Sequence, residues 1–122
     1  MKKVLKIGIM SRKEYMARTV AIANGLYVPK AGEPKICFES VKSLAEVLSN
    51  DNRELLSLIS REKPRSLNEL ELLSGRKSSN LSRTLKTMEK FGIVSLVREN
   101  RQLRPVLNAT DVKVEFGLTH AA

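Results

Sequence analysis

Positively charged and small polar side chains recur at helical spacing between residues 78 and 91. Projected at 100° per residue, Leu81, Leu85 and Met88 fall within about 40° of one direction, which predicts a buried face. The opposite direction carries Ser79, Arg83, Lys86 and Lys90. Lysine and arginine on the free face of a helix neutralise phosphates or reach base edges in a groove. We therefore expect this helix to contact an anionic partner, although a lone helix of this kind is most often a solvated surface helix.

A capped helix and a tight turn precede this segment. Ser66 and Glu69 have the spacing of a capping box, which opens a short helix. Its apolar members are Leu67, Leu70, Leu72 and Leu73. Gly75 then suits the left-handed residue that ends a helix and turns the chain. The pattern predicts a helix-turn-helix, whose second helix begins with side chains short enough to let its amides approach a phosphate. These side chains are Ser78, Ser79 and Asn80.

Two short strands joined by a polar turn follow the basic helix. Residues 93–98 and 103–107 have the composition of strands, and residues 99–102 are polar. Pro105 cannot donate to a ladder of hydrogen bonds, so its strand is expected at an edge. The hairpin, 93–107, predicts a wing that brings charge to the flanking DNA backbone or minor groove, although an ordinary solvated hairpin remains an alternative. The charged side chains are Arg98, Arg101 and Arg104.

The N-terminal third predicts a strand, a helix and a second strand. Residues 4–10 alternate as in a strand, and Ser11 with Glu14 predicts a capped helix over 12–24 that ends at Gly25. The apolar stripe of this helix is Met16, Val20 and Ala23. A loop rich in proline and glycine leads to a short strand at 35–39, where Cys37 is expected to be a small buried side chain.

Two amphipathic helices and a last strand complete the expected elements. The first helix carries a predicted buried stripe of Val41, Leu44, Ala45 and Leu48. After a polar break at 49–52, the second helix spans 53–61 and stops before Pro64. Residues 111–118 alternate again, with Val112, Val114 and Phe116 on one side. This strand is expected to pair with the N-terminal strand or with a second chain.

These elements predict an α+β protein with three segments. Residues 1–39 form an N-terminal strand-helix-strand extension for dimer or partner contact. Residues 40–107 form a winged helix-turn-helix with a three-helix core and a hairpin wing, and residues 108–122 form a C-terminal strand and tail. The positive charge is densest in the second segment, since residues 61–104 hold eleven Lys and Arg against five Asp and Glu.

Composition narrows the function classes. A formal charge of +9 favours a polyanionic partner, and few aromatic residues disfavour single-strand readers that stack bases. One cysteine and one histidine, His120, supply neither a disulfide framework nor a His-based triad or metal cluster, so we expect no enzyme activity, no metal and no cofactor. His120 is expected to be a terminal residue without a ligand. No apolar run could cross a membrane, and no leader with a cleavage site is evident, which predicts a cytoplasmic protein.

From Ser66 to Leu107 the sequence resembles the winged helix-turn-helix of MarR-like and ArsR-like regulators of bacteria and archaea. The most specific stretch is NLSRTLKTMEKFGIV, in which a serine-arginine pair lies on the recognition helix and a glycine ends that helix before the wing. The whole chain, with its KIGIMSRKEYMARTVAIANG opening, its P-K-x-G-E-P-K loop and its VEFGL ending, resembles small predicted transcriptional regulators often encoded beside a toxin gene.

The resemblance implies a DNA-binding repressor and a set of contact residues. It implies that Ser79, Ser82 and Arg83 face the groove and that Arg101 lies at the wing tip. Lys77 stands where many family members carry Ser or Thr, so the first helical turn is expected to begin at Ser78. With the residues found above, the expected DNA-binding set is Lys77, Ser78, Ser79, Asn80, Ser82, Arg83, Lys86, Arg98 and Arg101.

We therefore expect a sequence-specific regulator of transcription, most simply a repressor, that binds double-stranded DNA as a homodimer. The recognition helix is expected in the major groove and the wing on the flanking backbone or minor groove. The alternative is an antitoxin that neutralises a toxin protein encoded nearby while it regulates its own operon. A third possibility is binding of double-stranded RNA or the ribosome, which a basic winged helix can support by shape.

Overall fold

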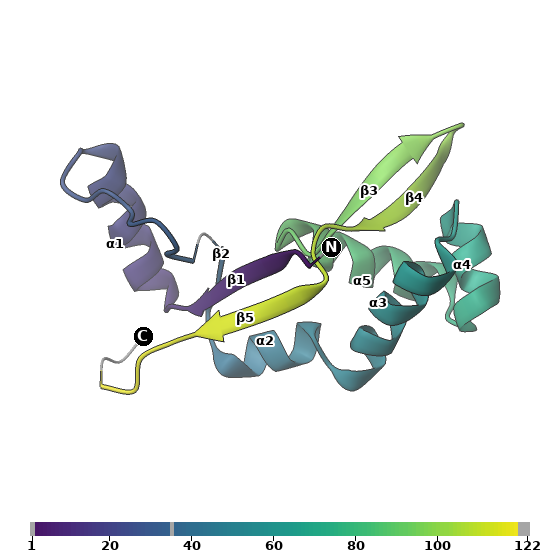
Figure 1. Ribbon diagram of the computed structural model, residues 1–122, viewed down its shortest axis with the longest axis horizontal. Coiled ribbons are helices and arrows are strands. Elements are labelled where there is room, and N and C mark those ends of the chain that lie inside the picture. Colours follow the sequence, from purple (N-terminus) through teal and green to yellow (C-terminus); the bar gives the residue numbers. More distant parts are fainter. Residues whose placement is uncertain (1, 35, 120–122) are drawn as a thin grey trace. The chain divides into compact units, whose positions relative to one another are not determined.

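The chain folds into two compact units of helices and small sheets (Figure 1). The computed structural model describes residues 2–34 and 36–119, so the expectation for His120 lies outside the described residues. The first unit contains Val47–Thr110 together with the chain up to Lys3, and the second contains Val4–Glu46 together with the chain from Asp111 onward. The described residues form five helices and two sheets, which confirms the predicted α+β class.

The first unit consists of three helices and a hairpin. Its elements are α3 (Asn50–Glu62), α4 (Leu67–Ser74), α5 (Ser78–Lys90), β3 (Val94–Glu99) and β4 (Gln102–Leu107). All three helices and β3 contribute side chains to one apolar core, each exposed by at most 4%. The core residues are Leu55, Ile59, Leu70, Leu81, Leu85, Met88, Ile93 and Val94. This core fixes the angle at which each helix presents its polar face.

Serine side chains begin two of these helices. The Ser66 hydroxyl accepts a hydrogen bond from the Glu69 amide at 3.1 Å, as the capping-box spacing predicts. The Glu69 carboxylate accepts from the Arg65 amide at 3.2 Å, one residue before the predicted donor. Ser49 caps α3 in the same way, accepting from Asn52. The polar break predicted at 49–52 is therefore wrong, because those residues are the cap and first turn of α3.

Backbone conformation explains where α3 and α4 end. Gly75 follows α4 with φ of 74°, the left-handed conformation predicted for it. Lys63 follows α3 with φ of 47°, directly before Pro64. Two side chains of the apolar set expected on α4 are exposed, Leu72 by 87% and Leu73 by 43%.

The hairpin β3–β4 has a two-residue turn that extends both predicted strands. Asn100 and Arg101 have φ of 51° and 65°, as turns that match the twist of paired strands require. Pro105 pairs with Leu96, whose amide donates outward to the Glu89 carboxylate at 3.0 Å. The pair thus lies at a position where neither amide bonds across the hairpin, and the missing N–H of Pro105 leaves the ladder intact.

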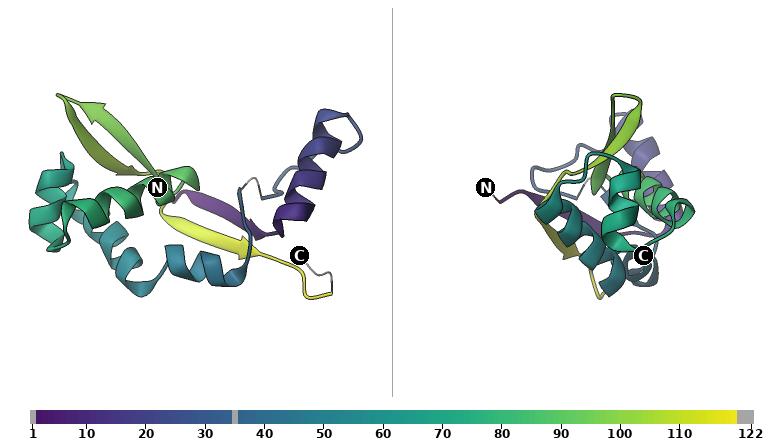
Figure 2. Two further views of the ribbon diagram at one scale, coloured as in Figure 1. Left: turned by 180° about the vertical axis from the view of Figure 1, so that it is seen from behind. Right: turned by 90° about the vertical axis from the view of Figure 1, so that its right-hand side faces the viewer.

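The second unit joins the two ends of the chain in one parallel sheet. Its elements are β1 (Val4–Ile9), α1 (Arg12–Ala23), β2 (Ile36–Phe38), α2 (Val41–Val47) and β5 (Asp111–Glu115), and α2 reaches the boundary with the first unit. The strand order is β2-β1-β5, with Ile7 beside both Ile36 and Val114. The parallel course of β1 and β5 can also be followed from behind (Figure 2). Of the two pairings open to residues 111–118, the structure has the one with the N-terminal strand.

Two predicted buried stripes are absent from this unit. No residue of α1 or α2 is buried. Met16 and Val20 of α1 are 56% and 55% exposed, and Val41 of α2 is 50% exposed. The buried apolar side chains are instead Ile7 and Phe38 of the sheet. The spacing of apolar residues correctly predicted that these segments are helical, but it could not show whether another element packs against the apolar side.

The two units divide the chain differently from the three expected segments. The boundary expected at residues 39 and 40 lies after Glu46, so most of α2 belongs with the N-terminal strands. The C-terminal strand belongs to the same unit because it pairs with β1. No helix in the described part of the chain is long and apolar enough to cross a membrane.

Candidate nucleic-acid interface

Helix α5 separates an apolar side from a polar side. Leu81, Leu85 and Met88 are 0% exposed, as predicted. The residues on the opposite side are all exposed. They are Ser79, Arg83, Lys86 and Lys90, which we call the basic stripe. The buried contacts hold the helix in place while the stripe faces solvent.

The N-terminus of α5 carries no side-chain cap. Its cap residue, Lys77, makes no capping hydrogen bond through its side chain. The helix begins at Ser78, as expected from the position of Lys77. Amides in the first turn of such a helix are donors for an external acceptor, and the helix dipole favours an anion there.

The nine expected contact residues all lie in the first unit. Lys77, Ser78, Ser79, Asn80, Arg83 and Lys86 are exposed on or just before α5. Ser82 is half-buried. Arg98 and Arg101 are exposed on the hairpin, and Arg101 forms part of its turn. Helix α5 and its N-cap residue thus gather seven of the nine side chains within about three helical turns.

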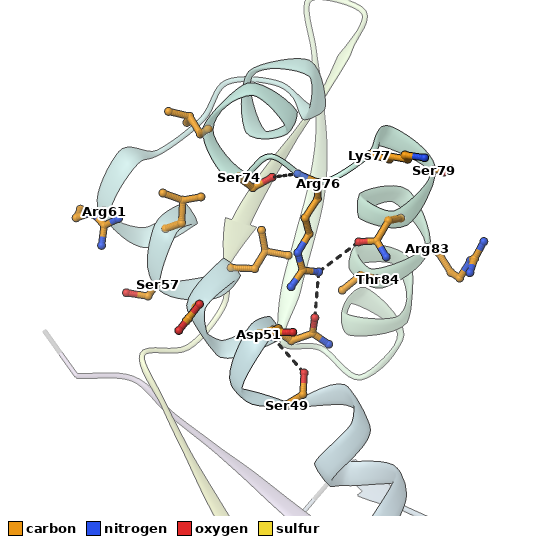
Figure 3. A pocket seen from close by; sticks show the side chains of 16 residues that line it. Ser49, Asp51, Ser57, Arg61, Ser74, Arg76, Lys77, Ser79, Arg83 and Thr84 are labelled. Carbon is orange, nitrogen blue, oxygen red and sulfur yellow. Dashed lines mark hydrogen bonds between the residues drawn. The ribbon is translucent and has the colours of Figure 1, made fainter.

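A groove of about 1010 Å³ runs between α3 and α5. Arg76, in the turn between α4 and α5, reaches into it and donates to the side-chain oxygens of Asn52 at 3.1 Å and Asn80 at 3.4 Å (Figure 3). In the same view Arg83 points away from Arg76. Arg76 therefore links the turn to both helices, whereas Arg83, which also lines the groove, takes no part in this link.

Sequence reasoning missed the role of Arg76. The four-residue spacing to Asn80 was visible in the sequence, but Asn52 lies 24 residues away and could not be paired with it. The groove also has acidic side chains on its α3 wall, Asp51 and Glu54. Basic side chains line the same groove, so its lining carries charges of both signs; they are Arg61, Arg76, Lys77 and Arg83.

The wing residues differ in how far their charges are paired. Arg104 donates to Glu99 at 3.2 Å, and the two side chains are 38% and 51% exposed. Glu99 thus offsets the positive charge of Arg104, which was expected from the sequence to contact DNA. Lys90, at the end of α5, lies 5.8 Å from the centre of the Phe91 ring. Among the residues that the structure describes, neither Arg98 nor Arg101 takes part in an ion pair.

The second unit holds a separate cluster of charged and phenolic groups. Glu33 accepts from the Tyr27 hydroxyl at 2.7 and 2.8 Å, from the Lys30 amide at 2.8 Å and from the Arg18 guanidinium at 3.0 Å. The hydrogen bonds from Tyr27 and the Lys30 amide hold the pKa of Glu33 below its ordinary value of 4.5. The hydrogen bond to Glu33 raises the pKa of Tyr27 above 10.0. These bonds connect α1 to the loop after it.

Cys37 lines a hollow beside this cluster. Its thiol is half-buried, and burial raises its pKa, so the thiolate is disfavoured. Adding a Cβ at Gly8 would bring it to 3.3 Å from the Cys37 sulfur. These features fit a packing role. Across the residues that the structure describes, no group of three His, Cys, Asp or Glu side chains could hold a metal ion.

The fold and the polar surface define a small α+β protein with a basic helix and a projecting hairpin. Residues 47–114 match the model of the HVO_A0114 family, which is more than half of the chain, and the protein belongs to that family. The match begins at the first residue of the main segment of the first unit and extends into β5. No curated protein and no solved structure matches the chain.

Proposed function

We propose that the protein is a regulator of transcription that binds double-stranded DNA through the first unit. In this proposal α3, α4 and α5 with the hairpin β3–β4 act as a winged helix-turn-helix, in keeping with the resemblance of residues 66–107 to MarR-like and ArsR-like regulators. The observation that carries the proposal is the division of α5 into a fully buried apolar side and an exposed basic stripe.

Helix α5 supplies the chemistry that a duplex requires. Arg83 and Lys86 on the stripe contact phosphates or base edges, and Ser79 and Asn80 are short enough to let the helix enter the major groove. The amides in the first turn of α5, which no side chain caps, donate hydrogen bonds to a phosphate of the DNA backbone.

The hairpin extends the contact beyond the major groove. Arg101 in the turn and Arg98 on β3 reach the backbone or minor groove beside the site. Arg104 contributes less, because Glu99 offsets its charge. Repression then follows from occupation of a promoter by the bound protein. Neutralisation of a toxin protein, the alternative from the sequence, stays a prediction.

The salt dependence of DNA binding tests this proposal. The affinity for a duplex of about three helical turns is measured at several salt concentrations for the wild type and for the double variant Arg83→Ala, Lys86→Ala. Each lost phosphate contact lowers the log–log slope by about 0.9. Loss of the phosphate contact of Lys86 should therefore remove about 0.9 from the slope, and loss of the base contact of Arg83 should weaken binding further.

A matched control separates the stripe from the overall charge. The double variant Arg12→Ala, Lys13→Ala removes the same charge from exposed positions of α1. It should keep the wild-type slope. Equal losses in the two double variants would show that binding follows net charge and that the stripe is not the contact surface.

A further inference from the structure

Strand β5 has one paired edge and one edge that no described strand covers. It pairs with β1 and ends the sheet order β2-β1-β5. All five of its residues are exposed. Along one face of the strand, Val112, Val114 and Phe116 are 38%, 37% and 49% exposed. An alternating strand with a free edge is a template for pairing with another strand.

We propose that β5 is the interface between two copies of this chain. The two β5 strands pair antiparallel about a two-fold axis perpendicular to the sheet. This axis passes between the two copies of Val114, which lie opposite each other, and we call it the axis through Val114. The three-stranded sheet of each copy then becomes half of a continuous six-stranded sheet. The occupant of the edge is a second copy because the side chains of β5 complement themselves in this register.

Geometry limits the registers to a short set. A two-fold axis perpendicular to the sheet places the same face of both copies on the same side. Opposite residues must therefore both come from the apolar face or both from the charged face. An axis through Val112, Lys113 or Val114 meets this condition, whereas an axis between two residues does not.

Charge distinguishes the three registers. An axis through Lys113 places the two lysines opposite each other and Asp111 opposite Glu115, so every charged pair is repulsive. An axis through Val112 places Lys113 opposite Asp111, but it pairs only three residues of β5. Beyond them the chain turns back to Thr110, which bonds to Lys3 within the first unit.

An axis through Val114 makes every pair favourable. Lys113 of each copy lies opposite Glu115 of the other, which gives two opposite-charge pairs. On the other face Val112 lies opposite Phe116, and Val114 lies opposite Val114. Pairs of aromatic with β-branched residues and pairs of opposite charge are those that stabilise antiparallel strands. This register pairs residues 113–115 of the two strands and adds the contact of Val112 with Phe116, the residue that follows β5 directly.

The proposal goes beyond DNA binding and is tested without DNA. Its consequence for the proposed function is that one assembly carries two copies of α5, which suits an operator with two-fold symmetry. The dimer would have an isologous interface, in which each contact between two different residues occurs twice, once in each direction.

Charge reversal on β5 tests the register directly. The dissociation constant of the dimer is measured by sedimentation equilibrium for the full chain, for Lys113→Glu, for Glu115→Lys and for the double variant with both changes. Each single change turns two attractive pairs into two repulsive ones and should weaken the dimer by about tenfold. The double variant exchanges the charges and should return the dissociation constant to within about threefold of the wild type.

The control is Lys13→Glu, an equal charge reversal at an exposed position of α1. It should leave the dimer unchanged. A monomeric wild type, or a dimer indifferent to all β5 variants, would overturn the proposal. A tighter dimer for Glu115→Lys would place the axis at Lys113. Weakening by Lys113→Glu without rescue in the double variant, with the circular dichroism spectrum of the wild type retained, would place it at Val112. Each of these results also contradicts the proposed register, while none bears on DNA binding.

Discussion

Glu33 connects the loop that follows α1 to the helix itself through the hydrogen bonds that it accepts. It accepts hydrogen bonds from Tyr27, the Lys30 amide and Arg18, all of which favour its charged form. A carboxylate so placed has a lowered pKa in the folded state. Its contribution to stability is therefore present above the ordinary pKa of 4.5 and is lost as the pH falls through the lower folded value.

The variant Glu33→Gln should accordingly unfold at a lower temperature than the wild type at neutral pH, because the amide loses the charge that its three donors favour. The difference between the two proteins should shrink as the pH falls below about 4.5 and the wild-type carboxylate becomes protonated. Thermal unfolding followed by circular dichroism from pH 7 to pH 3 measures it. A difference that is absent at pH 7, or that grows on acidification, would contradict the role assigned to Glu33.

At the scale of elements, helices α1 and α5 show what periodicity can and cannot predict. Both have an apolar stripe in the sequence, and both helices lie within one or two residues of the predicted bounds. Local residues explain why these bounds were predictable, since Ser11 caps α1 and the glycines after the two helices, Gly25 and Gly92, have positive φ. Burial depends on which element packs against the stripe, and for α1 that information is not local. Met88 of α5 is fully buried, whereas Met16 of α1 is 56% exposed.

This contrast predicts different costs for the same substitution. Met88→Ala removes a buried side chain and should lower the free energy of unfolding by about 2–5 kcal/mol, because it also leaves a cavity. Met16→Ala should change it by no more than about 0.5 kcal/mol. Urea unfolding of both variants measures the two values. Comparable losses would show that α1 is packed against a surface of its own.

The parts of the candidate site that lie within one helix were predictable from the sequence, whereas the contacts between different elements were not. The basic stripe follows from the spacing within α5, and its exposure is as predicted. The link from Arg76 to Asn52 was not predictable, because the two residues belong to different elements. The Arg104–Glu99 pair was missed for a related reason, since it needed the exact register of the hairpin.

For the whole molecule, the main departure from the sequence analysis is that the chain ends meet. Strand β5 pairs in parallel with β1. Lys3 and Thr110, which lie directly before the two strands, are hydrogen-bonded to each other although they are 107 residues apart in the sequence. Alternation identified both strands, but strands so far apart leave many possible partners. The result is a two-unit molecule in which the basic unit, 47–110, is inserted between segments of the sheet unit.

The central claim is that the first unit reads DNA sequence through α5. The most direct measurement is selection of bound duplexes from a random library, repeated with the variant Arg83→Ala. We predict that the wild type enriches a defined motif and binds it at least about 10³ times more tightly than a scrambled duplex. Arg83→Ala should lose discrimination at one position of that motif by about 1–3 kcal/mol. No enriched motif, or an unchanged motif and affinity in the variant, would contradict the claim.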